Sequence, residues 1–276
     1  MTPISLEDMA ASVPDGALIA LPPDYSLPPC SLGRALIRRG ARNLRVLGVP
    51  ITGFVTDLLV GAGCVAEVES SAVTLGEAGF APRFTAAVRE GRIVMRDATC
   101  PAIHTALQAA EKGVPFMPLR GVLGSDILAH RPDWKVVSNP FANDEDPILL
   151  VPAIRPQIAA FHAAMADEEG NVWVGRRREV ATIAHAAERS LVTVERIVPG
   201  NMLEDERLAP GCISATYVET VAIAERGNWP SGLLDERAMD VAHYGEYARM
   251  AKTEAGFREY LDRYVFAEAV KKVAAE

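Results

Sequence analysis

Residues 17–49 read ALIALPPDYSLPPCSLGRALIRRGARNLRVLGV and hold two apolar runs separated by an amphipathic segment. The runs Ala17–Leu21 and Leu44–Val49 are short and mostly apolar. Such runs are typical of strands buried on both faces of a parallel sheet. We therefore expect two neighbouring strands here, joined by a crossover segment.

The segment between the two runs has the pattern of a helix. Apolar side chains recur at helical spacing at Leu32, Ala35 and Leu36. Ser31 precedes them and is expected to be the N-cap, and Gly40 follows them and is expected to end the helix. A strand, a helix and a second strand in this order are the repeating unit of an α/β fold.

The same alternation continues along most of the chain. Further strands are expected at Val65–Ser70, Ile93–Met95, Val114–Met117, Asp146–Ile154, Gln157–Ala166 and Leu191–Val198, and further helices at Phe54–Val60, Ala102–Lys112 and Val180–Ala187. Two charged, amphipathic segments, at about 235–251 and 254–272, are expected to be terminal helices. The pattern predicts a single domain over residues 1–276. That domain is an α/β fold with an open, mostly parallel, Rossmann-like sheet, helices on both faces and a helical C-terminal tail.

The composition is that of a soluble globular protein, since 49% of the 276 residues are apolar and 23% are charged. The net charge of −8 argues against a nucleic-acid interface, which needs a basic face. No apolar run approaches the roughly 18 residues of a membrane span, and the first residues lack the features of a secretory signal. The four cysteines form no CxxC pair, so we expect reduced thiols in a cytoplasmic protein.

Common catalytic and cofactor motifs are absent or misplaced. Residues 61–66 (GAGCVA) match the loose dinucleotide fingerprint, but a helix is expected before them and a strand after them, which reverses the required order. We interpret these glycines as a helix stop. No two of the five histidines have the spacing of a helical metal pair, so we expect no metal site and structural roles for His162 and His185. No GxSxG nucleophile elbow is present.

The loop after Val114–Met117 is the first candidate site. It contains Arg120, Gly121, Gly124 and Ser125, and we expect it at the carboxyl end of a parallel strand, where open α/β sheets bind ligands. Its glycines would let the backbone approach a ligand, and its arginine offers a fork for a carboxylate or phosphate. The alternative is an ordinary glycine-rich turn with a solvated arginine.

Two other strand ends carry polar side chains. Ser70 and Ser71 end one expected strand, and Asp97 and Thr99 lie just before the helix that begins near Pro101. Ser70 and Ser71 offer hydroxyl groups to a ligand, and the helix start beside Asp97 and Thr99 favours an anion, so we expect both segments to line a ligand pocket. The alternative for each is a capping role without a ligand.

Residues 91–126 resemble a known family. They read GRIVMRDATCPAIHTALQAAEKGVPFMPLRGVLGSD. Glutaconate CoA-transferase alpha subunits have a similar stretch: G-x-I, an acidic residue and Thr, a helix, G-[IV]-P-F-x-P, and then R-G-x-L-G-[ST]-D. Residues 150–171 (LVPAIRPQIAAFHAAMADEEGN) are similar to the family's V-P-A-x-R-P-D…H-A…A-D-x-x-G-N. Matches in order run from about residue 14 to 265, so the whole chain resembles the alpha subunit of a class I coenzyme A transferase of the glutaconate type.

The resemblance implies a reaction and a partner. Family members move coenzyme A between an acyl-CoA and a carboxylic acid through a glutamyl-CoA thioester. In two-subunit members the nucleophilic glutamate belongs to the beta subunit, so we expect a hetero-oligomer and no catalytic nucleophile in this chain. Glu67, Glu69 and Glu77 lie nearby in sequence but are not assigned. The resemblance also implies CoA thioester as substrate and no permanently bound cofactor. It places an acidic residue at Asp97 too, and from its position at a strand end we expect Asp97 to be an auxiliary catalytic residue.

One departure from the family pattern keeps other functions open. Family members carry D-G-x-x, three apolar residues and Gly-Gly-Phe, but here Asp15-Gly16 is followed by Pro22-Pro23-Asp24. Proline has no amide hydrogen, so a loop that used those N–H groups could not do so here. One alternative is a subunit of a related CoA-ester ring-opening hydrolase, in which a carboxylate activates water. Another is a non-catalytic subunit or metabolite sensor.

Overall fold

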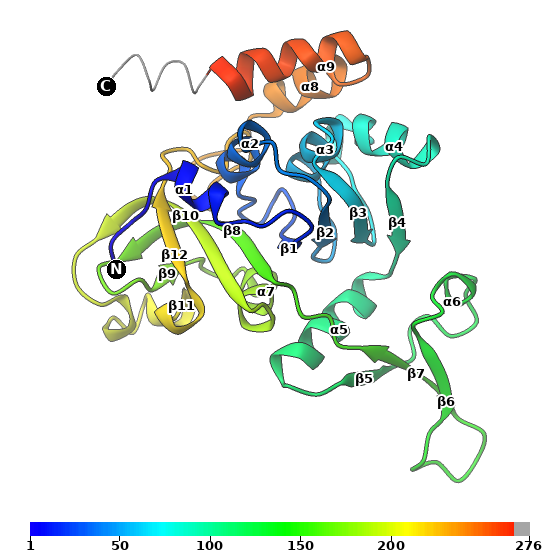
Figure 1. The fold of residues 1–276 in the computed structure, drawn as a ribbon. Helices are drawn as coiled ribbons and strands as arrows, with labels where there is room; N and C mark the ends of the chain where they lie inside the picture. The colour runs from blue at the N-terminus through cyan, green and yellow to red at the C-terminus, as the bar shows by residue number, and fades with distance from the viewer. Residues whose placement is uncertain (268–276) are drawn as a thin grey trace.

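A nine-stranded sheet forms the centre of the protein in the computed structural model, which describes residues 1–267 (Figure 1). All its strands but β9 and β11 run parallel, in the order β12-β10-β8-β1-β2-β3-β4. Their bounds are β1 Leu18–Leu21, β2 Leu44–Gly48, β3 Val65–Ser70, β4 Val94–Asp97, β8 Ile158–Asp167, β10 Arg189–Val198 and β12 Thr220–Ile223. The short strands β9 (Val172–Trp173) and β11 (Cys212–Ile213) pair antiparallel beside the second half of β8. The expected open, mostly parallel sheet is confirmed.

Helices cover both faces of this sheet, as its nearly continuous apolar strands require. One face is covered by α1 (Leu6–Ala11), α2 (Cys30–Arg39) and α3 (Phe54–Gly61), with α4 (Pro82–Arg89) beside α3. The other is covered by α5 (Cys100–Glu111) and α7 (Arg178–Ala186). Within residues 1–267, no helix combines the length and apolarity needed to cross a bilayer.

The C-terminal helices α8 (Val241–Met250) and α9 (Glu254–Leu261) pack outside α2 and α3 (Figure 1). Phe54 lies at the centre of this contact, with the rings of Tyr244, Tyr247 and Tyr260 at 5.7, 4.9 and 6.4 Å between centroids. The first helix begins at Val241, not near 235, because the preceding residues form turns and a short bridge. The second continues as a π-helical turn to Phe266, and the expected helical residues 268–272 lie outside the described part.

The segment between α5 and β8 departs from the expected pattern. The expected strands at Val114–Met117 and Asp146–Ile154 exist as β5 (Phe116–Leu119) and β7 (Pro147–Pro152), but they form a separate antiparallel sheet with β6 (Lys135–Ser138). This sheet stands at the lower right of Figure 1, with the short α6 (Ile127–His130) beside it. Placing both strands in the parallel sheet was wrong, because a short apolar run does not encode the direction of its neighbour.

Of the two caps predicted for α2, the C-terminal one is confirmed and the N-terminal one is wrong. Gly40 ends α2 with φ +74°, a conformation that favours glycine, as expected. Ser31 is not the N-cap, because the helix begins one residue earlier, at Cys30, with Pro29 before it. The glycine-rich stretch 61–66 does lie between helix α3 and strand β3, so it is a helix stop.

Candidate active site at the carboxyl edge of the sheet

The structure brings together two of the three predicted polar segments. Ser70 and Asp97 are register partners at the ends of the parallel strands β3 and β4. Ser71 follows Ser70, and its Oγ lies 3.1 Å from Sγ of Cys100, the first residue of α5. The segments 70–71 and 97–100 therefore meet at one edge of the sheet, as strand direction predicts.

These residues also have structural contacts. The Oγ of Ser70 donates to the Ala72 carbonyl at 2.8 Å, and the Oγ of Ser71 donates to the Pro50 carbonyl at 2.7 Å. Thr99 caps α5, since its side chain accepts from the Ala102 amide at 3.3 Å. The Asp97 side chain is exposed. A ligand role for Ser70, Ser71, Asp97 and Thr99 stays a prediction.

The third predicted segment lies elsewhere. Arg120 and Gly121 follow β5 in the antiparallel sheet, so placing this loop at the carboxyl edge of the parallel sheet was wrong. Arg120 forms a two-pronged ion pair with Asp146, with 2.7 Å from Nη2 to Oδ2, and this hydrogen bond lowers the pKa of Asp146 to about 2. Ser125 donates to the Val122 carbonyl at 2.8 Å, and Gly124 has φ +79°. The loop is thus an ordered turn held by its own backbone and by Asp146, the residue before β7, and its ligand role also stays a prediction.

A cavity of about 750 Å³ opens where β1, β2 and β3 end, beside helix α8. Its polar lining comes from Asp24, Tyr25, Thr52, Thr74, Glu77 and Tyr244. Among the lining residues that the structure describes there is no cysteine, serine, histidine or lysine. The cavity therefore offers carboxyl and hydroxyl groups to a ligand.

Asp24 is the residue of this cavity with the clearest chemical signature. The Phe54 amide at the start of α3 donates to its two carboxylate oxygens at 3.1 and 3.0 Å. Burial nevertheless raises the pKa of Asp24 to about 6, with the amide and the Tyr244 hydroxyl partly opposing this shift. A carboxyl group with such a pKa can accept or donate a proton near neutral pH.

Gly53 makes this arrangement possible. A Cβ at position 53 would overlap Oδ2 of Asp24 and lie 2.5 Å from the carbonyl oxygen of Thr74. Asp24 was not among the site residues predicted from the sequence. The signal was present, however, since Asp24 belongs to the Pro22-Pro23-Asp24 triplet that departs from the family pattern.

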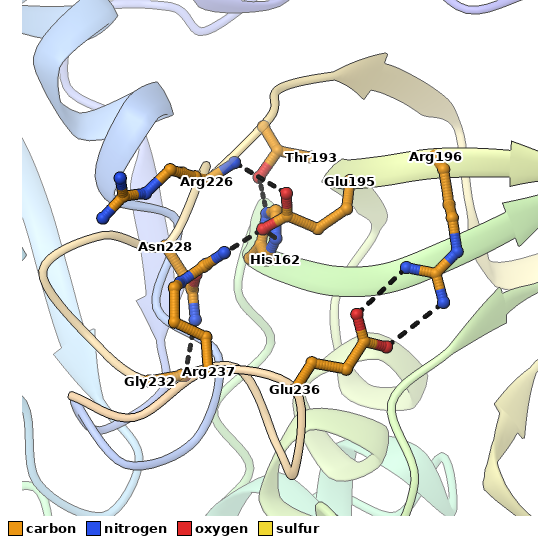
Figure 2. Close-up of polar contacts among 9 residues, drawn as sticks. All are labelled: His162, Thr193, Glu195, Arg196, Arg226, Asn228, Gly232, Glu236 and Arg237. Atoms are coloured by element: carbon orange, nitrogen blue, oxygen red, sulfur yellow. Dashed lines mark hydrogen bonds and ion pairs between the residues drawn. The ribbon is translucent and has the colours of Figure 1, made fainter.

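A second polar cluster lies within the sheet, around His162 (Figure 2). Nδ1 of His162 is 2.9 Å from Oγ1 of Thr193, and Nε2 is 3.2 Å from Oε1 of Glu195. Burial lowers the pKa of His162, although Glu195 opposes this. Both ring nitrogens have partners, so the structural role expected for His162 is supported by its contacts.

Glu195 connects this cluster to the loop before α8. It accepts from the Arg226 amide at 2.6 Å and pairs with Arg237 at 3.0 Å (Figure 2). Burial acts to raise the pKa of Glu195, but the hydrogen bonds from His162, Arg226 and Arg237 together lower it to about 2. The ionised carboxylate therefore fastens residues 226–237 to strands β8 and β10.

The architecture defines an α/β protein with a cavity at the carboxyl edge of a parallel sheet, the usual ligand site of this class. A family model described as coenzyme A transferase matches residues 4–220. The chain belongs to the coenzyme A transferase family and is similar to the alpha subunits of its members. The resemblance seen in the sequence is thereby confirmed.

The chain is similar to several individual members of this family and to one of their solved structures. It is 29% identical to the alpha subunit of 3-oxoadipate CoA-transferase from Pseudomonas knackmussii, over 95% of this chain and 94% of that protein. It is 28% identical to a cholesterol ring-cleaving hydrolase IpdA subunit of Rhodococcus jostii, over 99% and 97%. An uncharacterized protein of Archaeoglobus fulgidus is 30% identical over 84% of this chain, which spans only about half (51%) of that relative. Glutaconate CoA-transferase from Acidaminococcus fermentans matches structurally with a TM-score of 0.89 and 26% identity, covering 97% of this chain and 89% of that one.

Proposed function

We propose that this chain is the alpha subunit of a two-subunit enzyme that transfers coenzyme A between an acyl-CoA and a carboxylic acid. The observation that carries the proposal is the cavity at the ends of β1, β2 and β3, which is large enough for an acyl group and lies at the ligand-binding edge of a coenzyme A transferase fold. A glutamate from a beta subunit would supply the nucleophile, as the resemblance to two-subunit family members implies. The relatives that are themselves one subunit of such a transferase support a partner of this kind.

The reaction divides into balanced steps. The partner's glutamate carboxylate attacks the thioester carbonyl, and the CoA thiolate leaves as a mixed anhydride forms. The thiolate then attacks the glutamyl carbonyl, which releases the first acid and leaves a glutamyl-CoA thioester. A second carboxylic acid reverses both steps and takes the CoA. In this chain, Asp24 in its protonated form would donate a hydrogen bond to the oxygen that becomes negative.

Asp24 also supports a second candidate function, hydrolysis of a CoA ester. As a carboxylate with a pKa of about 6, it could remove a proton from water as the water attacks a carbonyl of the substrate. The similarity to hydrolase subunits over nearly the whole chain favours keeping this candidate. Transfer needs an acceptor acid and hydrolysis does not.

The test uses the chain co-purified with its co-encoded beta subunit. Acyl-CoA is supplied with and without acceptor acids, and both free CoA and new acyl-CoA are measured. Transfer predicts acceptor-dependent new acyl-CoA and a glutamyl-CoA thioester on the beta chain that hydroxylamine traps. Acceptor-independent release of free CoA identifies the hydrolase. The absence of both reactions across a panel of dicarboxylic and oxo acids would favour a non-catalytic subunit.

A further inference from the structure

Three consecutive arginines, Arg176, Arg177 and Arg178, stand at the start of α7 and line a second cavity of about 250 Å³. Arg207, from the loop before β11, lines it as well. Four arginines thus line one small cavity in a chain whose net charge is −8. Such a local excess of positive charge attracts anions.

The positive charge of this cavity is largely uncompensated. Across residues 1–267, Arg176, Arg177 and Arg178 form no ion pair with a carboxylate, and only Arg207 has one, with Asp205 at 3.3 Å. Nε of Arg177 is buried and has no hydrogen-bond acceptor among these residues. A buried donor without an acceptor is costly, and an anion bound in the cavity could accept its hydrogen bond.

The backbone at the start of α7 also favours an anion. Helix α7 has nine residues, and no side chain caps its N-terminus. The unpaired amides of a first helical turn, together with the helix dipole, favour an anion at this end. Arginines and an uncapped helix start therefore converge on the same cavity.

The arginine cavity and the larger cavity share a loop. Glu179, in the first turn of α7, accepts a hydrogen bond from Oγ of Ser26. The neighbour of Ser26 in that loop, Tyr25, lines the larger cavity. Burial raises the pKa of Tyr25, Glu179 raises it further and Arg177 lowers it, so the charge of Arg177 reaches this side chain. A long ligand that entered both cavities would have to pass over Tyr25, which is exposed, because Ser26 is fully buried.

We propose that Arg176, Arg177, Arg178 and Arg207 form a phosphate-binding pocket that holds the phosphate groups of the coenzyme A thioester. Coenzyme A carries a diphosphate and a 3′-phosphate at the end opposite its thiol, and arginine binds such groups in a two-pronged manner. The assignment to coenzyme A rests on the proposed function. The pocket itself requires only a phosphorylated ligand.

The experiment measures binding by calorimetry, without turnover, on the chain co-purified with its partner. The probes are CoA, 3′,5′-ADP, inorganic pyrophosphate and acyl-pantetheine, which lacks phosphates. The variants are the double change Arg176→Gln and Arg178→Gln, and the single change Arg207→Gln, which leaves α7 untouched and serves if the double variant fails to fold. Arg89→Gln, at an exposed arginine in the last turn of α4, is the matched control.

We expect the dissociation constants for CoA and 3′,5′-ADP to rise about tenfold or more in the double variant, about threefold or more in Arg207→Gln, and not at all in Arg89→Gln. Binding of acyl-pantetheine should be unchanged. CoA and ADP affinities equal to those of Arg89→Gln would overturn the pocket while leaving the proposed function intact. Arginine-dependent binding of ADP and pyrophosphate without any CoA binding would support the pocket and overturn the proposed function.

Discussion

The backbone amide of Phe54 holds the carboxylate of Asp24 between the end of β1 and the start of α3, at 3.1 and 3.0 Å from its two oxygens. The amide is one of the donors that a helix start leaves unpaired, so the contact stabilises α3. The same carboxyl lines the 750 Å³ cavity with a pKa raised to about 6. Asp24 is therefore both a capping group and the best-placed titratable group for chemistry.

Asp24→Asn is expected to lower kcat/KM of the two-subunit enzyme at least tenfold, about 1.4 kcal/mol of barrier. If Asp24 acts as a base, activity rises with pH through about 6 in the natural enzyme, and this limb disappears in the variant. If it acts as an acid, activity falls through the same pH. A pH–rate profile from about pH 4.5 to 8.5 measures both.

Asp57→Asn is the matched control for this variant. Asp57 is fully buried, accepts from the Phe84 amide and the Tyr247 hydroxyl at 2.7 Å each, and also has a pKa raised to about 6, but it does not line the cavity. Its pH–rate profile should keep the natural shape. If Asp24→Asn keeps it too, Asp24 has only its capping role.

Asp57 itself should make stability depend on pH. Burial, the main cause, raises its folded pKa to about 6 from the ordinary 3.8, so between these values the folded state holds a proton that the unfolded state has lost. This contribution is fully present below about pH 4 and is lost as pH rises through about 6, at up to about 1.4 kcal/mol per pH unit. The unfolding free energy of the natural chain minus that of Asp57→Asn should therefore fall as the pH rises from about 4 to 6. A difference that stays constant in urea titrations would contradict the prediction.

Glu195→Gln is expected to destabilise the folded state at about pH 7 by about 2 kcal/mol, because it removes the charge that His162, Arg226 and Arg237 share. The folded pKa of Glu195 is lowered to about 2 from 4.5, so its contribution is present above about pH 4.5 and is lost as pH falls toward 2. Glu236→Gln, which breaks only the exposed pair with Arg196 in Figure 2, is the control. Equal melting temperatures for the two variants would argue against a structural role for the cluster.

Arg120→Ala tests the loop of the antiparallel sheet. If Arg120 reaches the acidic substrate from a neighbouring position, the variant should raise its KM about tenfold. Asp146→Asn is the informative control, because it frees Arg120 from its carboxylate partner and should leave KM unchanged or lower it. Unchanged KM values in both variants would mean that Arg120 serves only to join β5 to the start of β7.

Thr99→Ala and Asp97→Asn separate capping from catalysis at the end of β4. Thr99→Ala should cost about 1 kcal/mol of stability, since its oxygen accepts the Ala102 amide, with turnover per folded molecule unchanged. Asp97→Asn should lower turnover about tenfold with little change in melting temperature, because its side chain is exposed. Thermal melts and active-site-normalised rates on the same samples decide between the two roles. If Asp97→Asn turns over normally, Asp97 leaves the site.

The parallel part of the fold could be predicted because local pattern and global position agree there. Ala17–Leu21 and Leu44–Val49 are mostly apolar, and apart from the exposed Arg45 the structure largely buries them between two helical layers. The direction of a strand is set by its neighbours, so the pattern at 116–119 and 147–152 predicted strands but not their antiparallel pairing.

The candidate site was predictable only where it follows from strand direction. Ser71 and Cys100 meet because β3 and β4 are parallel neighbours, which the sequence order implies. Asp24 and Phe54 are 30 positions apart, and their contact depends on how the loop after β1 folds over α3. The spacing of apolar residues does not predict the path of such a loop. The triplet Pro22-Pro23-Asp24, which departs from the family pattern, was the one sign in the sequence that this loop is unusual.

The close approach of position 53 to Asp24 limits which substitutions these two positions accept. A side chain larger than hydrogen at position 53 would occupy the space of the Asp24 carboxylate, so the two positions cannot change independently. A lineage that gains a residue with a Cβ at position 53 must give up the acid at position 24 and must also move the backbone at Thr74, whose carbonyl oxygen lies 2.5 Å from that Cβ position. Loss of the acid alone therefore does not free position 53, whereas the acid at position 24 needs the glycine already in place.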